Sequence, residues 1–248
     1  MDKLWDFMAR YEIQEKKIVS ETMFTHQMLY APYGFYNIPL EANDKFLELY
    51  TNAIMEGFVP SIVEKHLDTV PIVIDLNFIQ LSYDNRRFYT NETMRAIIEV
   101  YNTAIKRYVL ADNIFAFVLE KSEPDKHHGE YFDGIHIIYP NICTTPQIQK
   151  LIRKEFLIQA HKQKIFNKIP LMTTLENVVN ENVIYDKGWL MYGSSKNPPS
   201  SVYYVTKCYK LDHSNNKLLC TDYSLDHIDN IFDVKYFIGL LSCRKQMV

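Results

Sequence analysis

The sequence predicts an α/β or α+β domain in which helices pack on a mixed β-sheet. Apolar runs of strand length alternate along the chain with apolar stripes of helical spacing. Apolar residues make up 47% of the 248 positions and charged residues 23%, close to the average for globular proteins. No internal repeat or low-complexity tract interrupts the alternation. The chain is therefore long enough for one large domain or two small ones around a buried core.

The first half of the chain contains a predicted helix, a strand and a longer helix. Residues 46–54 carry apolar side chains at helical spacing, and Gly57 follows as a plausible stop. Residues 70–78, VPIVIDLNF, are an apolar run rich in β-branched side chains, which predicts a buried strand. Thr90 or Asn91 can cap the long helix that comes next.

The second half adds a helix and several strands. Thr145 followed by Pro146 is a good helix start, because proline suits the first helical position. HSNN at 213–216 predicts a turn that closes a hairpin. The predicted strands of this half are 115–120, 134–140, 189–192, 201–211 and 217–220.

Charge and hydropathy exclude several classes of protein. A formal net charge of −3 argues against a general polycation that coats nucleic acid, although a local basic groove remains compatible with it. No window of about 18 apolar residues exists, so no membrane-spanning helix is expected. The first 17 residues are charged throughout and lack the apolar core of a signal peptide, which predicts an intracellular protein. The phosphate-binding loop GxxxxGK[ST] is absent, which excludes a P-loop ATPase within this chain.

Asp75 and Asn77 follow the first buried strand and are the first candidates for chemistry. Because side chains alternate along a strand, both point to the same face. An acid-x-acid pair after a strand commonly holds two divalent metals, but here the second acid is an amide. A metal-dependent site, a weakened form of one, and a plain strand end with hydrogen-bonded polar groups all fit this pattern.

His136 and Lys196 are the candidates for binding phosphate. His136 lies within an apolar strand, where it is either a core residue or a ligand, and Gly134 before it would let a ligand approach the backbone. Lys196 follows a Gly-Ser-Ser turn whose backbone N–H groups, if exposed, would help it to bind phosphate. A solvated lysine in a turn is the alternative for Lys196.

Three stretches of the sequence resemble, in their order along the chain, the motifs of the archaeo-eukaryotic primase superfamily: PIVIDLNF, FDGIHIIYP and NENVIYDKGWLMYGSSK. These motifs are most similar to those of the primase domain in the primase-helicases of large cytoplasmic DNA viruses such as poxviruses. The resemblance covers roughly residues 30–210. It implies an α+β fold with mixed or antiparallel sheets and flanking helices around a catalytic core like that of RNA-recognition domains. Residues 31–212 would form this core, after an N-terminal helical segment, 1–30, and before a C-terminal hairpin and helix, 213–248.

The resemblance also implies an activity and partners. Such domains polymerise nucleotides on a single-stranded DNA template without needing a starting 3′ end. Three carboxylates hold two Mg²⁺ or Mn²⁺ ions, and a histidine with nearby basic residues holds the triphosphate of the incoming nucleotide. The implied partners are therefore single-stranded DNA, nucleoside triphosphates and a replicative helicase that is missing here or lies on another chain. No membrane partner is implied, and the expected location is a viral replication site or the host cytoplasm.

Carried onto this sequence, the family's motifs place its first acid at Asp75 and its other two at Asn77 and Asn180. The triphosphate-binding histidine corresponds to His136 and the later lysine to Lys196. Weaker candidates for phosphate or template contact are Arg86 and Arg87. The lysine that relatives often carry four residues before the histidine is replaced here by Phe132.

Two of the three expected acids are thus amides, and this leaves two main hypotheses. The first is an active primase-polymerase domain with an altered metal site, in which another carboxylate compensates; Asp84, Asp133 and Asp186 are candidates, with Asp186 the first to examine. The second is a catalytically inactive paralogue that binds nucleic acid, nucleotide or a replication partner. A third hypothesis, an unrelated domain that shares these strings by chance, fails if Asp75, Asn77, His136 and Asn180 converge on one cleft.

Overall fold

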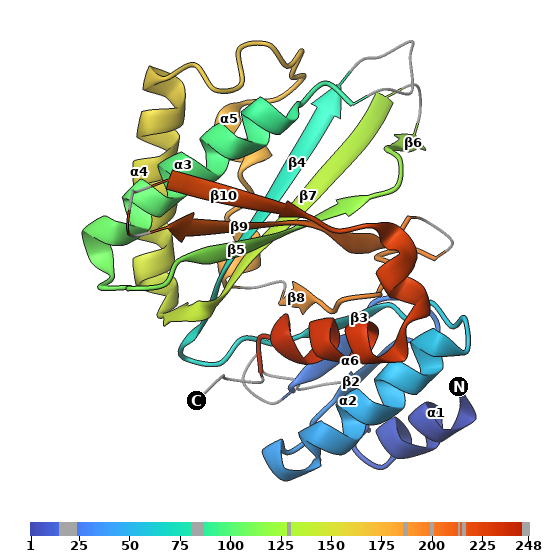
Figure 1. Cartoon of the computed structure of the whole chain (residues 1–248). Coiled ribbons are helices and arrows are strands. Elements are labelled where there is room, and N and C mark those ends of the chain that lie inside the picture. The colour runs from blue at the N-terminus through green and yellow to red at the C-terminus, as the bar shows by residue number, and fades with distance from the viewer. Residues whose placement is uncertain are drawn as a thin grey trace.

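Two antiparallel sheets and the helices around them form the body of the protein (Figure 1). The computed structural model describes residues 1–14, 24–80, 87–127, 130–185, 188–198, 201–212, 214 and 217–244. Every strand pairing among these residues is antiparallel, so the α+β expectation is confirmed and the α/β alternative, with its parallel sheet, is wrong.

The smaller sheet has four short strands in the order β2-β1-β3-β8. Figure 1 shows it at the bottom of the molecule, beside the helices α1, α2 and α6. The strands are β1 (His26–Met28), β2 (Gly34–Tyr36), β3 (Ile62–Glu64) and β8 (Trp189–Leu190), and the helices are α1 (Asp2–Ala9), α2 (Leu40–Met55) and α6 (Ile231–Leu240).

The larger sheet has the order β10-β9-β5-β7-β4, with the short strand β6 paired to β7. The two long helices α3 and α4 cover the face turned away from the smaller sheet (Figure 1). These elements are β4 (Val70–Gln80), α3 (Asn91–Tyr108), β5 (Phe115–Lys121), β6 (Asp125–His127), β7 (Glu130–Thr144), α4 (Pro146–Lys162), β9 (Tyr203–Asp212) and β10 (Lys217–Asp222).

Local signals in the sequence account for the ends of the long helices. The Thr90 side chain accepts a hydrogen bond from the Thr93 backbone N–H, which caps α3 as predicted. α4 begins with Pro146 in its first turn. α2 ends just before Gly57, whose φ of +84° is a left-handed conformation that glycine adopts without strain.

Alternating side chains place two hydrophobic clusters on the two faces of the larger sheet. From β4, Leu76 and Phe78 pack with α3 and α4, whereas Val73 belongs to the cluster between the sheets. The cluster between the sheets also contains residues from α1 and α6. Residues from all three predicted segments, 1–30, 31–212 and 213–248, therefore share one cluster, and the division into these segments remains a prediction.

Short elements escaped the sequence prediction. The three-residue strands β1, β2, β3 and β6 are too short to show an alternating pattern. The same holds for the single-turn helix α5 (Leu175–Val178) and the 3₁₀ helices η2 (Asn182–Ile184) and η3 (Leu225–Asp229). The turn predicted at 213–216 lies almost wholly outside the described residues.

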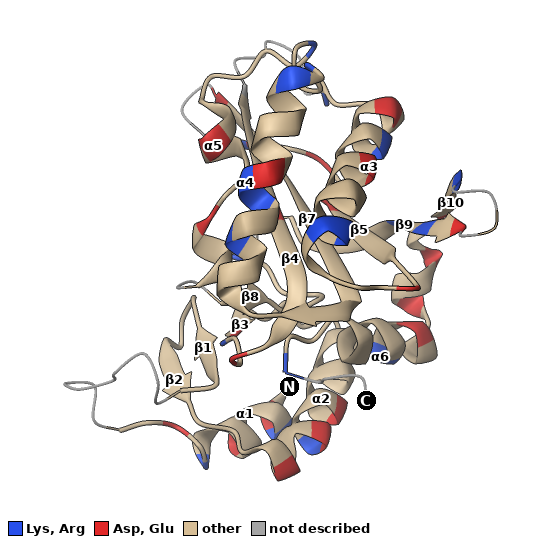
Figure 2. Cartoon of the chain, turned by 90° about the vertical axis from the view of Figure 1, so that its left-hand side faces the viewer, with Lys and Arg blue, Asp and Glu red and all other residues tan. Residues whose placement is uncertain are grey.

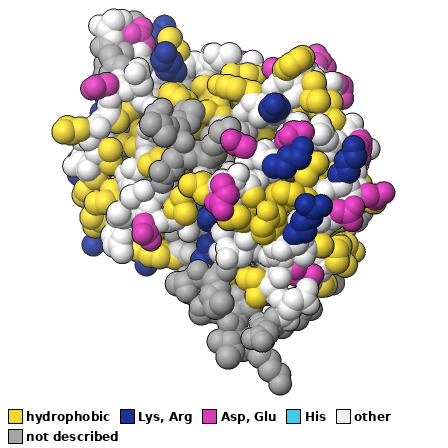
Figure 3. Space-filling model, turned by 90° about the horizontal axis from the view of Figure 1, so that it is seen from below, with side chains coloured by type: hydrophobic (Ala, Val, Ile, Leu, Met, Phe, Trp, Pro, Cys, Tyr) yellow, Lys and Arg dark blue, Asp and Glu magenta, His cyan; other side chains and the backbone are white. Residues whose placement is uncertain are grey.

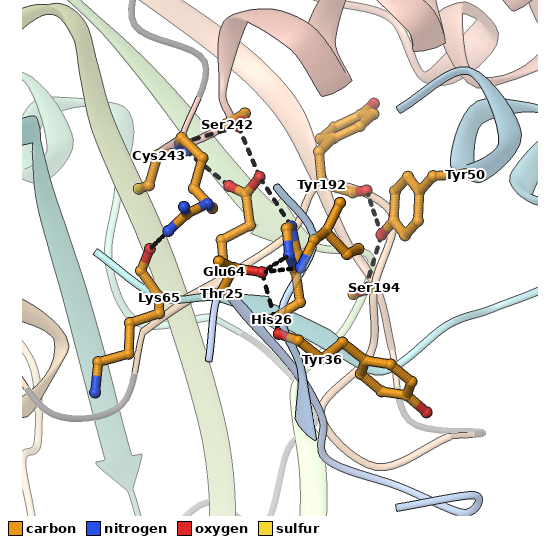
Figure 4. Close-up of polar contacts among 12 residues, drawn as sticks. Thr25, His26, Tyr36, Tyr50, Glu64, Lys65, Tyr192, Ser194, Ser242 and Cys243 are labelled. Carbon is orange, nitrogen blue, oxygen red and sulfur yellow. Dashed lines mark hydrogen bonds and ion pairs between the residues drawn. The ribbon is translucent and has the colours of Figure 1, made fainter. Parts of the chain in front are cut away.

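A buried carboxylate joins the end of the described chain to the smaller sheet. Glu64 on β3 is inaccessible to solvent and accepts hydrogen bonds from Ser242 Oγ at 2.6 Å and from the Cys243 backbone N–H at 2.7 Å (Figure 4). His26 on β1, also fully buried, places Nε2 3.8 Å from Glu64 Oε1. Burial lowers the pKa of His26 below its ordinary value of 6.5, which favours the neutral imidazole.

Charged residues of both signs are spread over the helices (Figure 2). On the face seen from below, basic, acidic and apolar side chains are interspersed without a large field of one sign (Figure 3). No helix in the described part of the chain is long and apolar enough to cross a membrane.

Candidate functional site

A cleft of about 670 Å³ opens where the two sheets meet, a volume typical of small-molecule sites. It brings together five of the residues predicted from the sequence, which come from β4, from β7 and from the two loops that carry Asn180 and Lys196. The polar and aromatic residues that line it are Gln27, Asp75, Asn77, Lys121, Asp125, Phe132, His136, Asn180, Trp189, Ser195, Lys196, Asn197, Ser201 and Tyr203.

Strand register aligns the site residues of the larger sheet. Asp75 on β4 lies directly opposite His136 on β7, and Asn77 lies opposite Gly134. Asp75 is in the middle of β4, because the strand continues to Gln80; its predicted place at a strand end was wrong. Leu76 and Phe78 face the helices, so Asp75 and Asn77, which alternate with them along β4, face the cleft.

Two amides hold the Asp75 carboxylate. Asn180 Nδ2 donates to Asp75 Oδ2 at 2.7 Å, and Asn77 Nδ2 donates to the same oxygen at 3.1 Å. The backbone supports this contact, since the Asn180 N–H donates to the Asp75 carbonyl at 2.9 Å and Val179 bridges to Leu76. The segment before Asn180 thus covers the outer edge of β4 and fixes the amide against the acid.

This donor set fits a pair of divalent cations poorly. Mg²⁺ and similar ions are held in proteins chiefly by carboxylate oxygens, and Asp75 is the one carboxylate at the three positions where the family has acids. Asp75 Oδ2 already accepts hydrogen bonds from Asn77 and Asn180. Asn180 Oδ1 also accepts one, from the Asn182 backbone N–H at 3.1 Å. Within the described residues, no cluster of three or more His, Cys, Asp or Glu side chains is arranged to hold a metal ion.

His136 is buried between two aromatic rings. The Tyr203 ring stacks on it at 3.8 Å between centroids, and the Trp189 ring lies 4.8 Å away. Burial lowers the His136 pKa to about 4, against the opposing effect of Asp75, whose Oδ1 lies 3.7 Å from Nε2. The imidazole is therefore neutral at pH 7 and can act as a hydrogen-bond donor or acceptor without carrying charge.

The Gly-Ser-Ser turn positions Lys196 but offers no backbone N–H groups from its two serines. Ser194 N donates to Met191 O and Ser195 N donates to Pro60 O, so the predicted exposed N–H groups are used within the protein. Ser194 Oγ accepts from Ile62 N and meets Tyr50 OH (Figure 4). The lysine itself is exposed on the rim of the cleft.

Gly134 makes room for a tyrosine. A Cβ at this position would lie 2.2 Å from the Tyr203 hydroxyl, so the ring occupies the space that the sequence suggested for a ligand. Glycine is needed here to let the Tyr203 ring stack on His136.

The remaining candidates lie elsewhere. Arg87 Nε pairs with the buried Asp133 at 3.1 Å, and its Nη1 lies 3.7 Å from Glu120, on the face of the sheet opposite the cleft. Arg87 therefore does not line the cleft, and Asp133 cannot compensate for a lost metal ligand there. Burial raises the pKa of Asp133 to about 6, although Arg87 opposes the shift. Arg86, Asp84 and Asp186 lie outside the described residues.

Lys121, Asp125, Trp189 and Tyr203 line the cleft but were not among the predicted site residues. Lys121 ends β5, and Asp125 begins β6 on the next short hairpin. No motif marks them, because they reach the cleft through strand pairing that depends on residues distant in sequence. The aromatic pair could have been suspected only from the high tyrosine content, 18 residues, which does not identify positions.

Comparisons with known proteins identify the family that the chain resembles. Residues 25–209 match the family described as "C962R protein N-terminal AEP domain". Matching curated proteins include a "Putative helicase" of Acanthamoeba polyphaga mimivirus, which is 44% identical over 248 residues, and one of Invertebrate iridescent virus 6, which is 23% identical over 221. The match to the first covers 98% of this chain and 25% of the relative; for the second the shares are 78% and 22%. The chain thus spans about a quarter of the length of these relatives.

The family match covers most of the chain, and it includes the strands that carry Asp75 and His136 and the loops that carry Asn180 and Lys196. The similarity to the mimivirus relative extends over nearly all of the chain. This protein therefore belongs to the archaeo-eukaryotic primase (AEP) superfamily, among the AEP domains of large DNA virus proteins.

Proposed function

We propose that this domain binds a nucleoside triphosphate and single-stranded DNA in the cleft, as a primase-like domain of viral DNA replication whose nucleotidyl transfer is weakened or lost. The observation that carries the proposal is the state of Asp75, whose Oδ2 is held by the amides of Asn77 and Asn180. His136 and Lys196, the candidates for binding phosphate, both line the cleft. Their presence beside an acid that is held by two amides supports a domain that binds nucleotide while its metal site is altered.

The loss of charge is large enough to matter for catalysis. Two unit charges about 4 Å apart interact by about 4 kcal/mol at an effective dielectric constant near 20. An amide in place of a carboxylate gives up an attraction of that order for a divalent ion, and each 1.4 kcal/mol corresponds to about a tenfold change in rate. Two such replacements support a decrease in transfer rate of several orders of magnitude.

The relatives support a place beside a helicase. Both relatives are named as helicases, and this chain spans only about a quarter of their length. We propose that the domain presents template or nucleotide next to a helicase, which is either part of the same longer protein or a separate chain.

Two assays together test the proposal. The first is equilibrium binding of dATP and of a single-stranded oligonucleotide, for which we expect binding that weakens in His136→Ala and Lys196→Ala. The second is primer synthesis and extension on single-stranded DNA with Mg²⁺ or Mn²⁺, for which we expect little or no product from the native chain and a gain on restoring Asn77→Asp with Asn180→Asp. Robust extension by the native chain that disappears in Asp75→Ala would instead establish an active primase, and absence of any nucleotide binding would refute the proposal.

A further inference from the structure

Lys121 lies on the cleft side of β5 and lines the cleft. In the β5–β7 register Leu119 pairs with His136 and Glu120 with Ile135, so one further step places Lys121 opposite Gly134. Gly134 has no side chain, and the Lys121 side chain is only 12% exposed. Its amine extends over the Tyr203 ring, with Nζ 5.0 Å from the ring centroid.

Asp125 pairs with the Lys121 amine at the edge of the cleft. The carboxylate forms an ion pair and hydrogen bond with Nζ, and it is itself mostly buried, with 18% of its side chain exposed. In the β6–β7 register Asp125 lies directly opposite Phe132. Phe132 and His136 line the same cleft, so the ion pair between Lys121 and Asp125 faces the space that these side chains enclose.

We infer that Lys121 binds the triphosphate of a nucleotide in this cleft, and that Asp125 holds its amine until the phosphates arrive. The inference rests on the proposed function and names a residue that the family's motifs do not supply. Both side chains line the cleft and pair with each other there.

Charge in the cleft favours this exchange. Among the described side chains that line it, Lys121 and Lys196 are positive, Asp75 and Asp125 are negative, and His136 is neutral at pH 7. Asp75 is engaged by two amides, which leaves Asp125 as the carboxylate that competes with phosphate for a lysine. A triphosphate carries several negative charges and offers more acceptor oxygens than one carboxylate, so it can displace Asp125 from Nζ.

Arg87 supports the position of Lys121 from the other face. Its Nη2 donates to the Lys121 carbonyl, while its Nε pairs with Asp133. These contacts fix the backbone at the end of β5, where Lys121 turns toward the cleft. Arg87 therefore acts on the cleft through Lys121 and not by meeting phosphate.

The experiment measures dissociation constants for dATP and for inorganic triphosphate by calorimetry at low salt. For Lys121→Gln we expect about a tenfold loss of affinity for both probes, since a single cation in a partly open cleft contributes an effect of this order. For Asp125→Asn we expect tighter binding, by about fivefold, because the amine is released. The matched control is Lys126→Gln, one residue beyond Asp125 on the same strand, where the side chain is exposed and faces Tyr131.

The double variant separates this mechanism from a general change of charge. If Asp125 acts through Lys121, the gain from Asp125→Asn disappears in the Lys121→Gln background; an equal gain in both backgrounds overturns the inference. Unchanged affinity in Lys121→Gln overturns it as well. Because a gain of affinity cannot come from misfolding, Asp125→Asn keeps the test decisive even where Lys121→Gln is unstable. If the native chain binds neither probe, the proposed function fails first, and binding that weakens in Lys196→Ala but not in Lys121→Gln removes the inference alone.

Discussion

Restoring an acid at position 180 should destabilise the protein unless a divalent cation is present. In Asn180→Asp the 2.7 Å hydrogen bond to Asp75 Oδ2 is lost, and a second carboxylate faces the first. The lost bond to a charged group costs about 1.5–3 kcal/mol. Repulsion between two carboxylates about 4 Å apart adds about 4 kcal/mol at an effective dielectric constant near 20.

Protonation limits this cost. Neutralising an aspartate of ordinary pKa at pH 7 requires about 4 kcal/mol, so repulsion beyond that amount is relieved by uptake of a proton. A protonated carboxyl at position 180 can also donate to Asp75 Oδ2, so the protonated form recovers the hydrogen bond and limits the whole cost. We therefore expect Asn180→Asp to lower the free energy of unfolding by about 4 kcal/mol at pH 7 in EDTA, and by much less near pH 4. With Asn77→Asp added, Mn²⁺ should recover much of the loss, because a cation that binds only the folded state stabilises it by an amount that grows with the logarithm of its concentration relative to Kd.

The assay is urea unfolding followed by circular dichroism, in EDTA and in about 1 mM Mn²⁺, a concentration far above the Kd expected of such a site. Asn177→Asp is the matched control, since Asn177 is exposed on α5 and contacts Thr173 instead of Asp75. Equal stability of Asn180→Asp and the native chain in EDTA at pH 7 would refute the reasoning, because it would mean that the amide does not stabilise Asp75.

Three further outcomes follow from single contacts. Gly134→Ala should destabilise the fold by about 1–3 kcal/mol, since its Cβ would lie 2.2 Å from the Tyr203 hydroxyl; adding Tyr203→Phe should recover part of this in thermal unfolding, and no recovery would count against the contact. Glu64→Gln should cost about 1–3 kcal/mol in urea unfolding, because one amide oxygen cannot replace both carboxylate oxygens toward Ser242 and Cys243, and an unchanged midpoint would argue against this network. Burial lowers the His136 pKa to about 4, so stability that is present above pH 6.5 is lost as the pH falls toward 4. Relative to His136→Gln, the native chain should lose about 3 kcal/mol of unfolding free energy over that pH range. Parallel profiles of unfolding free energy against pH for the two proteins would contradict the shift.

Sequence patterns predicted the parts of the fold that local chemistry determines. Thr90, Pro146 and Gly57 lie at helix ends for reasons that involve only their neighbours, and the apolar, β-branched run at 70–78 forms a strand as its composition predicts. The length of β4 beyond residue 78 was not predictable, because its last residues are fixed by pairing with β7.

The candidate site was predicted only as far as the family's motifs extend. Asp75, His136 and Asn180 converge as the motif order suggested, and the chance-similarity hypothesis therefore fails. Lys121 could not be found in this way, since its place beside Gly134 depends on the register of two strands. For Arg87 the pattern was misleading, because it could not show which face of the sheet a residue in that loop would reach.

We propose that Asp75, held by Asn77 and Asn180, does not support a pair of metal ions. Electron paramagnetic resonance titration tests this by counting the Mn²⁺ ions bound per chain in the native protein, in Asp75→Ala, and in the double variant Asn77→Asp with Asn180→Asp. We expect no tightly bound pair in the native chain and a pair in the double variant. Two ions bound tightly by the native chain, both lost in Asp75→Ala, would contradict the claim.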